Sequence, residues 1–305
     1  MNRKKLQSLM LPVLSLIMLL GAIPAPARAE QIKTHQAEDF FSPGREQEEN
    51  RIHILLVGQD QREGEAGNRS DSMILCTISP KTKTVMLTSF LRDLYVTIPG
   101  HGKNRINAAY SWGGVELLEK TLEENFGIEV DGNIQVDFEQ FSKIIDSLGG
   151  VNIEIREDEA RQINRAVPWK TASAGKQTLS GDQALAYVRI RNLDADGDFS
   201  RTERQRKLLL AIAGDYQNMT MPAMMDLLKK LLPCVTTDLS YFQILTFGGI
   251  LLPVMKDLKL QSQQIPQKTA CRDQMVEGMA VLVPDLPKAR SFLQDSFDQI
   301  EKNHS

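Results

Sequence analysis

The hydrophobic pattern of the first half of the chain predicts several β-strands. Residues 52–57 are almost continuously apolar, which is typical of a strand buried on both faces. Residues 73–78 and 84–90 are two further apolar runs, and the short turn at residues 80–83 between them predicts an antiparallel hairpin. Shorter strand patterns cover residues 95–98, 133–136, 151–155 and 258–261.

Apolar positions three and four residues apart predict helices between and after these strands. One helix follows the cap residue Ser180 and leads into a charged stretch. Because helices alternate with strands and outnumber them late in the chain, the pattern predicts an α/β fold: a three-layer α/β/α sandwich with a central mixed sheet. The other helical patterns cover residues 106–113, 114–126, 138–148, 157–166, 201–216, 222–232, 241–255 and 284–300.

The first 50 residues predict a targeting segment and a linker. Basic residues 3–5 precede an apolar run at residues 9–23, and Ala27-Arg28-Ala29 fits a signal-peptide cleavage site. A spanning helix needs about 20 apolar residues, so the shorter run favours a signal peptide over a membrane anchor within residues 1–29. A signal peptide and a membrane anchor both predict that the rest of the chain lies outside the cytoplasm. Residues 30–50 are polar and predict a linker, which leaves 51–305 as the domain, with a helical C-terminal part at 211–305.

Composition and charge narrow the function classes. The 305 residues are 42% apolar and 25% charged, as in a globular protein, and the net charge of −3 gives no basic field for nucleic acid. Neither phosphate-loop nor dinucleotide-binding nor nucleophile-elbow motifs occur, and the four histidines lack metal-ligand spacing. Of three cysteines, Cys76 is expected to be a buried free thiol. Cys234 and Cys271 could form a disulfide, and the sequence leaves this open.

Positive charge is concentrated in residues 187–206. Residues 192–200 are rich in Asn, Asp and Gly, so the stretch reads as a charged loop held between two buried helices. Guanidinium groups match phosphate oxygens and stay charged, which suits a ligand with more than one phosphate. Arg189 and Arg191 can both reach one anion if the backbone between them is extended. The alternative is a solvated cluster that neutralises itself, because acidic residues share the stretch. Its arginines are Arg189, Arg191, Arg201, Arg204 and Arg206.

The predicted hairpin brings distant charged residues to one edge of the sheet. Asp71 stands just before the second strand and Arg92 just after the third, so an antiparallel pairing places them together. If the first strand also pairs antiparallel, its end brings Asp60 to the same edge. Two Asp carboxylates are ligands that Mg²⁺ accepts together with phosphate oxygens and water. The alternative is that both Asp residues only cap turns.

Taken together, these motifs resemble the LytR-CpsA-Psr family of cell-wall assembly proteins over about residues 52–210. The strong feature is that six short motifs occur in family order. Two departures are Arg105, where the family has lysine, and Ser200, where glycine is common. The motifs are Gly58-Gln59-Asp60, residues 69–73, Ser89-Phe90-Leu91-Arg92-Asp93, residues 102–110, Tyr187-Val188-Arg189-Ile190-Arg191 and residues 197–205.

The resemblance implies an extracytoplasmic transferase at the membrane surface. Such a protein moves a glycopolymer with its phosphate from an undecaprenyl-pyrophosphate carrier onto a muramic acid hydroxyl of peptidoglycan, and it holds the prenyl tail in an apolar tunnel. By resemblance, Asp60 and Asp71 position Mg²⁺, and Asp198 orients an arginine or activates the acceptor. Arg92, Arg189, Arg191 and Arg201 would hold the phosphate oxygens. Further substrate-binding candidates are Arg69, Lys103, Arg105, Asn107, Arg204 and Gln205.

Two alternatives remain at this point. The protein could be a pyrophosphatase that passes the same phosphate to water, or a non-catalytic receptor for prenyl-phosphate lipids. The pair Asp60 and Asp71 favours catalysis over binding, because a receptor could rely on arginines alone. Phosphoryl transfer needs mainly positioning and charge neutralisation, so no serine or cysteine nucleophile is expected. The polymer itself is not identified by the sequence.

Overall fold

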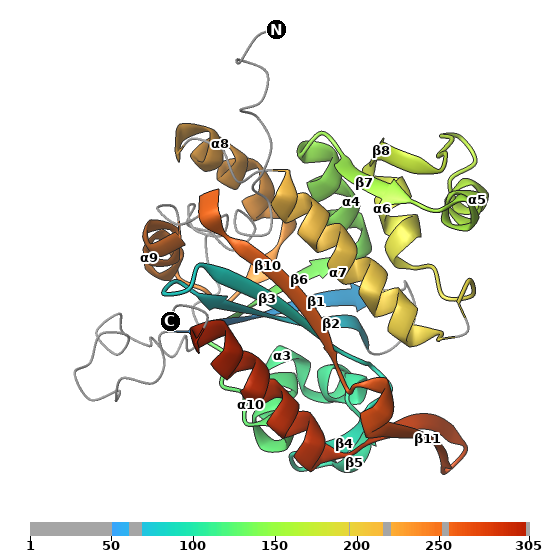
Figure 1. Ribbon diagram of the computed structural model, residues 1–305, viewed down its shortest axis with the longest axis vertical. Coiled ribbons are helices and arrows are strands. Elements are labelled where there is room, and N and C mark those ends of the chain that lie inside the picture. Colours follow the sequence, from blue (N-terminus) through green and yellow to red (C-terminus); the bar gives the residue numbers. More distant parts are fainter. Residues whose placement is uncertain (1–50, 61–68, 195, 216–220, 252–255, 303–305) are drawn as a thin grey trace, which may run out of the picture.

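The computed structural model describes residues 51–60, 69–194, 196–215, 221–251 and 256–302 (Figure 1). The expected signal segment at 1–29 and linker at 30–50 lie outside these residues. In the described part, helices cover both faces of one central sheet (Figure 1). The predicted three-layer α/β/α architecture is therefore confirmed.

The central sheet is mixed, as predicted. Its strand order over the described residues is β10-β3-β2-β1-β6-β9. Strand β2 pairs antiparallel with β1 and with β3, whereas β6 runs parallel to β1 and β10 runs parallel to β3. The strands are β1 (Ile52–Asp60), β2 (Arg69–Ser79), β3 (Thr84–Phe90), β6 (Gly132–Asp137), β9 (Thr236–Thr237) and β10 (Lys259–Ile265).

Alternate residues of the strands feed two separate cores. Ile54 and Leu56 of β1 face one layer of helices, while Leu55 and Val57 face the other, because successive side chains of a strand point to opposite faces. The first layer consists of α4 (Phe138–Ser147), α7 (Asp198–Gly214), α8 (Met221–Leu231) and α9 (Tyr241–Leu251); the second consists of α3 (Asn107–Phe126) and α10 (Leu286–Lys302). This explains why β1 reads as a nearly unbroken apolar run.

The charged stretch belongs to a third cluster beside the first layer. Strands β7 (Val151–Ile155) and β8 (Gly175–Leu179) form a two-stranded ribbon, which packs with α5 (Glu157–Ala166), α6 (Gly181–Val188) and α7. Helix α6 starts at Ser180, which forms a capping box with Gln183, as its sequence position suggested. Buried Tyr187 and Val188 anchor the end of α6 in this cluster, so the loop between α6 and α7 starts from a fixed point.

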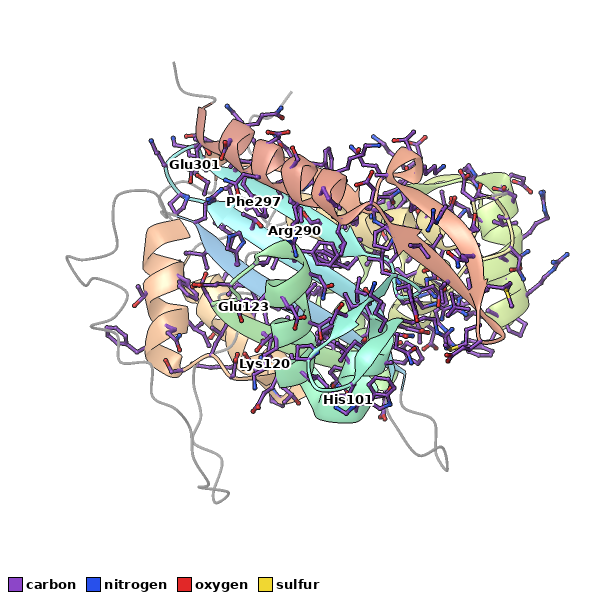
Figure 2. The ribbon with its side chains drawn as sticks, turned by 90° about the horizontal axis from the view of Figure 1, so that it is seen from below. His101, Lys120, Glu123, Arg290, Phe297 and Glu301 are labelled. Atoms are coloured by element: carbon purple, nitrogen blue, oxygen red, sulfur yellow. The ribbon has the colours of Figure 1, made fainter. Side chains whose placement is uncertain are left out.

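Helices α3 and α10 are joined by polar contacts as well as apolar packing. Helix α3 is kinked at Gly113 and Gly114, where its two predicted helical patterns meet. Arg290 of α10 donates from Nε to the carbonyl of Asn125 at 2.5 Å and from Nη2 to that of Glu124 at 2.8 Å, at the end of α3 (Figure 2). These bonds satisfy carbonyl groups that the helix itself leaves without partners.

The region after residue 211 is not only helical, which corrects the prediction for 211–305. Besides α8, α9 and α10 it contains β9, β10 and the hairpin of β11 (Cys271–Val276) and β12 (Met279–Pro284). Strand β10 contains the predicted strand at 258–261 in large part but extends to Ile265. The rest of β10 and the β11 strand lack an apolar pattern: β10 is a largely polar edge strand, and β11 is mostly exposed.

Two predicted strands, Tyr95–Ile98 (β4) and Val151–Ile155 (β7), lie outside the central sheet in two-stranded ribbons. Strand β4 pairs with β5 (Gly102–Arg105), which the sequence analysis assigned only to a motif. All three cysteines are free: Cys76 is buried as expected, and Cys234 and Cys271 do not form a disulfide. Among the described helices, none is long and apolar enough to cross a membrane.

Candidate functional site

A β-bulge in β2 sets the position of Asp71. Gly58 of β1 pairs with Ser72, and the next residue, Gln59, pairs with Ser70, so Asp71 is the extra residue between them. Bulges bend a strand and redirect a side chain, and they are common beside active sites. A Cβ at Gly58 would lie 3.1 Å from the Cβ of Ser72, which explains why glycine stands opposite the bulge.

The antiparallel pairing brings the end of β1 and the start of β2 to one edge of the sheet, as predicted. Asp60 pairs with Arg69, two residues before Asp71. The side chains of Asp60 and Arg69 lie outside the described residues, so their roles as metal and substrate ligands stay predictions. Their backbone positions fit the predicted convergence.

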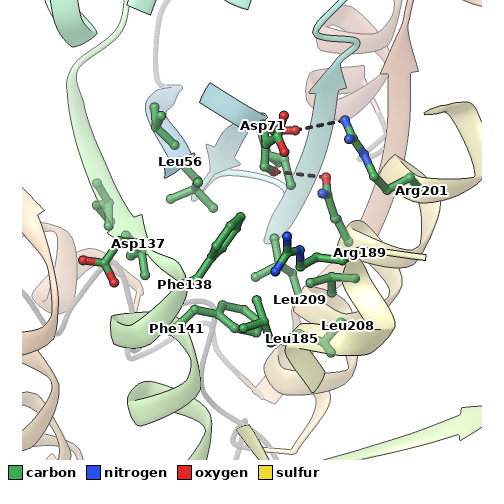
Figure 3. A pocket seen from close by; sticks show the side chains of 18 residues that line it. Leu56, Asp71, Asp137, Phe138, Phe141, Leu185, Arg189, Arg201, Leu208 and Leu209 are labelled. Atoms are coloured by element: carbon green, nitrogen blue, oxygen red, sulfur yellow. Dashed lines mark hydrogen bonds between the residues drawn. The ribbon is translucent and has the colours of Figure 1, made fainter. Parts of the chain in front are cut away.

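Asp71 is the centre of an arginine cluster assembled from three parts of the chain. Arg92, just after β3, donates from Nη1 to Oδ1 at 2.8 Å, and Arg191, after α6, donates from Nη2 to Oδ2 at 2.9 Å. Arg201 of α7 donates from Nη2 to the backbone carbonyl of Asp71 at 3.1 Å (Figure 3). The predicted meeting of Asp71 with Arg92 is confirmed, and two arginines of the charged stretch join them. We name Asp71, Arg92, Arg191, Arg201 and Asp198 the arginine cluster.

Asp198, the first residue of α7, is the second carboxylate of the arginine cluster. Its Oδ1 lies 2.8 Å from Nη2 of Arg201 and 3.7 Å from Nε of Arg92. Burial raises the pKa of Asp198, and the charges of Arg201 and Arg92 only partly oppose this. At Asp71 burial acts in the same direction, but the hydrogen bond and charge of Arg92 together with the charges of Arg201 and Arg191 outweigh it and lower the pKa. The site thus holds one firmly ionised carboxylate and one better suited to accept a proton.

Arg201 has the features of a buried anion-binding side chain. It is 2% exposed, and its Nε and Nη1 are buried without a hydrogen-bond partner in the described structure. Burial lowers the pKa of Arg201 to about 10, so the group is still charged at neutral pH. A buried cationic donor without a partner is costly, and phosphate oxygens would satisfy both nitrogens.

An apolar pocket opens from the arginine cluster into the space between the sheet and helices α4, α6 and α7 (Figure 3). Its cavity volume is about 130 Å³. Asp71, Arg189, Arg201 and Gln205 line it together with many apolar side chains. A ligand with an anionic head and a greasy tail fits this combination. The apolar lining is Leu56, Ile74, Ile134, Val136, Phe138, Phe141, Leu185, Val188, Leu208 and Leu209.

The backbone at Arg189 is not in the conformation that the shared anion site of Arg189 and Arg191 required. The expectation needed extended backbone, but Arg189 ends α6 with φ −96° and ψ −4°. Its guanidinium instead lies over the ring of Phe138, 4.4 Å from the centroid, and it lines the apolar pocket. Of the two, Arg191 is the one that reaches Asp71.

Arg204 is also placed differently from the prediction of a substrate-binding role. Its guanidinium is 4% exposed and pairs with Glu159 of α5, with Nε and Oε1 2.9 Å apart, and with Asp194. Since its charge is already compensated by two carboxylates in the protein, Arg204 supports the loop instead of facing the pocket. The alternative interpretation of residues 187–206 was a charge cluster whose acidic and basic side chains neutralise one another. The ion pairs of Arg204 show that this interpretation is correct for part of the stretch.

The remaining predicted residues surround the arginine cluster at different distances. Arg105 donates to Asp93 at 3.2 Å, and Asp93 also lies 3.5 Å from Nε of Arg92. Gln205 accepts a hydrogen bond from Ser72 at 3.1 Å. The backbone N–H of buried Asn107 donates to the carbonyl of Arg92 at 3.3 Å. Lys103 is exposed on β5 and makes no hydrogen bond or ion pair with the arginine cluster among the described residues.

Sequence reasoning did not find the residues that line the pocket. Phe138 and Phe141 were assigned to the buried face of a helix, and Leu208 and Leu209 to another. Their spacing is the same for a core and for a pocket wall, so no sequence signal separates the two. Asp93 was part of a quoted motif, but the bridge that it makes between Arg92 and Arg105 depends on the fold.

The donor set of the site agrees in part with a magnesium ion. Within the described residues, no group of three His, Cys, Asp or Glu side chains could hold a metal. Mg²⁺ needs only one or two carboxylates when phosphate and water supply the other oxygens, and the backbone places Asp60 beside Asp71. Both oxygens of Asp71 accept from arginines, which would have to turn toward a bound phosphate.

Fold and site together define a class: an α/β/α protein with an arginine-rich anion site at the head of an apolar pocket. The model of the LytR_cpsA_psr family matches residues 21–297. The chain therefore belongs to the LytR-CpsA-Psr family, as the motifs indicated.

Three similar proteins illustrate the relationship. The polyisoprenyl-teichoic acid–peptidoglycan teichoic acid transferase TagU of Oceanobacillus iheyensis is 38% identical over 174 residues, which cover 54% of this chain and about half (51%) of that protein's length. Regulatory protein MsrR of Staphylococcus aureus is 33% identical over 83% of this chain and 74% of its own. The solved structure of TagT (YwtF) from Bacillus subtilis with bound octaprenyl pyrophosphate lipid is 30% identical with a TM-score of 0.60, over 82% of this chain and 91% of that chain.

Proposed function

We propose that this protein transfers a glycopolymer with its phosphate from a polyprenyl-pyrophosphate carrier to peptidoglycan, forming a phosphodiester. The observation that carries the proposal is the position of Arg201 and Asp71 at the head of the apolar pocket. A prenyl pyrophosphate has the same two parts, an anionic head and a greasy tail. A related TagU is named as a transferase of this kind, and a related structure holds octaprenyl pyrophosphate.

The proposed reaction is one displacement at phosphorus. The acceptor hydroxyl oxygen bonds to the phosphorus that carries the glycopolymer, and the bond from this phosphorus to the bridging oxygen breaks. Prenyl phosphate leaves with the bond electrons, and the hydroxyl proton passes to a base. Arg92, Arg191 and Arg201 neutralise the phosphate oxygens, which is the largest requirement of phosphoryl transfer. Asp198 is our candidate for the base, because its pKa is raised.

Asp60 and Asp71 would hold Mg²⁺ in this proposal. The ion would supply further neutralisation of the pyrophosphate oxygens. What this chain contributes is the edge of β1 and β2, where the bulge places Asp71 beside the arginines. Binding of the anionic head would draw Arg92 and Arg191 from Asp71 to phosphate and so free its carboxylate for the ion.

The two alternatives differ from transfer in the fate of the phosphate. A pyrophosphatase would pass it to water, and a receptor would leave it in place. The name of the MsrR relative, a regulatory protein, is compatible with a receptor. We favour transfer over binding because two carboxylates of different pKa stand beside the arginines, which a receptor does not require.

The proposed substrates place the protein outside the cytoplasm at the membrane surface. Both the lipid carrier and peptidoglycan are reached there. The basic start and apolar run of residues 1–29 support this location, whether they are cleaved or anchor the protein.

The test is to incubate the protein with a lipid-linked glycopolymer, peptidoglycan oligomers and Mg²⁺, and to determine the products by mass. A conjugate through a phosphodiester is expected. Release of glycopolymer phosphate without conjugate would identify a pyrophosphatase, and an unchanged donor that is nevertheless bound would identify a receptor. Arg201→Ala should abolish conjugate formation. Arg161→Ala is the control, since Arg161 is exposed and its ion-pair partner among the described residues is Glu157 of its own helix.

A further inference from the structure

A second cavity lies on the other side of Arg189. It is a groove of about 430 Å³ between the end of α5, the loop that follows it and helix α6. Arg189 and Leu185 line both this groove and the apolar pocket, and Arg191 belongs to the groove and to the arginine cluster. The groove therefore adjoins the site proposed for phosphate transfer, with Arg189 between the two cavities. The polar and aromatic residues on its wall are Gln162, Trp169, Asp182, Arg189, Arg191 and Asn192.

Trp169 is the most unusual residue of the groove. Its side chain is 72% exposed, more than the other large apolar residues of the described structure. The loop that carries it is tied down on both sides. Gln183 donates to the carbonyl of Lys170 at 3.0 Å, and Asn164 exchanges two hydrogen bonds with Ala172 at 2.7 and 2.9 Å. The ring is thus exposed on a loop whose backbone is held by hydrogen bonds, and it offers an aromatic face at the groove wall on which a ligand can pack.

The polar residues around Trp169 are also available to a ligand. Gln162, Asp182 and Asn192 make no side-chain hydrogen bond to another described residue. Ala166 and Ala186 add small apolar side chains to the groove lining. Cations occur only at the end that meets the arginine cluster. A ligand that is phosphate-rich along its length would need cations throughout, whereas a chain of neutral sugar rings has apolar faces and a rim of hydroxyl and amide groups.

We propose that this groove binds the glycan strand of the acceptor, with the face of an N-acetylhexosamine ring stacked on Trp169. Gln162, Asp182 and Asn192 provide hydrogen bonds to the hydroxyl and acetamido groups. The strand then leads one hydroxyl toward Arg191 and the phosphate. This inference rests on the proposed function for the identity of the acceptor, but it concerns a site of its own with a ligand that can be measured separately.

The experiment titrates the protein with a lipid-free tetrasaccharide of alternating N-acetylglucosamine and N-acetylmuramic acid. The chain has only two tryptophans, so Trp112→Phe leaves Trp169 as the sole indole, and its fluorescence should change on binding. Trp169→Ala should raise the dissociation constant measured by calorimetry about tenfold, and Trp169→Phe should recover part of the lost affinity. Trp112→Ala is the matched control, because Trp112 is exposed and stacks on His101 outside the groove.

Transfer kinetics separate this inference from the proposed function. Trp169→Ala should raise KM for the acceptor, while kcat at saturating acceptor and the dissociation constant for prenyl pyrophosphate stay the same. If transfer occurs and Trp169→Ala binds the tetrasaccharide like wild type, the groove assignment is wrong and the function stands. If Trp169→Ala loses glycan binding but no donor is ever transferred, the groove stands and the function falls. A fluorescence response to phosphatidylglycerol vesicles and none to the glycan would overturn the assignment in favour of a membrane contact.

Discussion

Arg204 of α7 and Glu159 of α5 form an ion pair of 2.9 Å between Nε and Oε1, and each side chain is only 4% exposed. The pair separates the role of Arg204 from that of two other arginines of the charged stretch. Arg204 holds the loop between α6 and α7 through its ion pair with Asp194, whereas Arg191 and Arg201 donate hydrogen bonds to Asp71. The two groups should therefore respond differently to mutation.

Arg204→Ala should destabilise the protein by about 3–5 kcal/mol, because the buried carboxylate of Glu159 loses its nearest cation and keeps the more distant Arg156, 3.9 Å away. Thermal unfolding with a denaturant titration measures this change. The double variant Arg204→Met with Glu159→Leu removes both charges and should regain much of the lost stability. A single variant as stable as wild type would show that the pair is not buried in solution.

Arg191→Ala should weaken binding of a prenyl pyrophosphate by roughly 10- to 150-fold, since a charge-assisted hydrogen bond to phosphate contributes about 1.5–3 kcal/mol. Its melting temperature should stay close to wild type, because Arg191 is exposed. Arg191→Lys keeps the charge without the planar fork and should recover only part of the affinity. Equal dissociation constants for all three proteins would reduce Arg191 to a solvated charge.

Asp71→Asn separates binding from turnover. The variant removes the carboxylate that neutralises Arg92 and Arg191, so in the presence of a chelator it should bind prenyl pyrophosphate at least as tightly as wild type. Metal-dependent transfer should nevertheless be lost, because Asp71 is a proposed ligand of Mg²⁺. Calorimetry with EDTA and product analysis with Mg²⁺ test the two parts. Wild-type turnover of Asp71→Asn at limiting Mg²⁺ would disprove the metal role.

His53 should make stability depend on pH. Burial, assisted by the charge of Arg51, lowers the pKa of His53 to about 4, and the ring packs on Phe297 and lies 3.0 Å from Thr77 Oγ1. The unfolded state, with a pKa near 6.5, binds more protons between these values, so stability falls as pH falls from about 6.5 to 4, by up to about 3 kcal/mol.

His53→Asn tests this origin. Asparagine keeps a polar group near Thr77 but does not titrate, so the loss of stability between pH 7 and pH 4.5 should be smaller in the variant than in wild type. Denaturant unfolding at both pH values measures the difference. The same pH slope in both proteins would assign the acid sensitivity to other groups.

The sheet and the meeting of Asp71 with Arg92 could be predicted because they depend on local rules. Strand period, a short turn and antiparallel pairing fix which strand ends share an edge. Of the C-terminal strands, only the first part of β10 was predicted, at residues 258–261, and its full length and partner were not. Strand β10 is polar on an edge, and it is held by pairing with β3, which is distant in sequence.

The arginines show more clearly which features the sequence does not predict. Their concentration was visible in the sequence, but their roles were not. Arg204 faces Glu159, which lies 45 residues earlier, and only the packing of α5 against α6 and α7 brings them together. Arg189 ends a helix, and the conformation of one residue decides that it covers Phe138 instead of joining Arg191.

The bulge at Asp71 makes the length of β2 as important as its composition. Because faces alternate along a strand, deleting one residue among 70–72 would restore regular pairing with β1 and reverse the facing of the residues on one side of the deletion. Asp71 or Ser72 would then exchange sides of the sheet, even with every functional side chain still in the sequence. Substitutions along this edge test individual groups, whereas a single-residue deletion would remove the site as a whole. Variants and designs of this protein should therefore keep the residue count from Arg69 to Ile74 fixed.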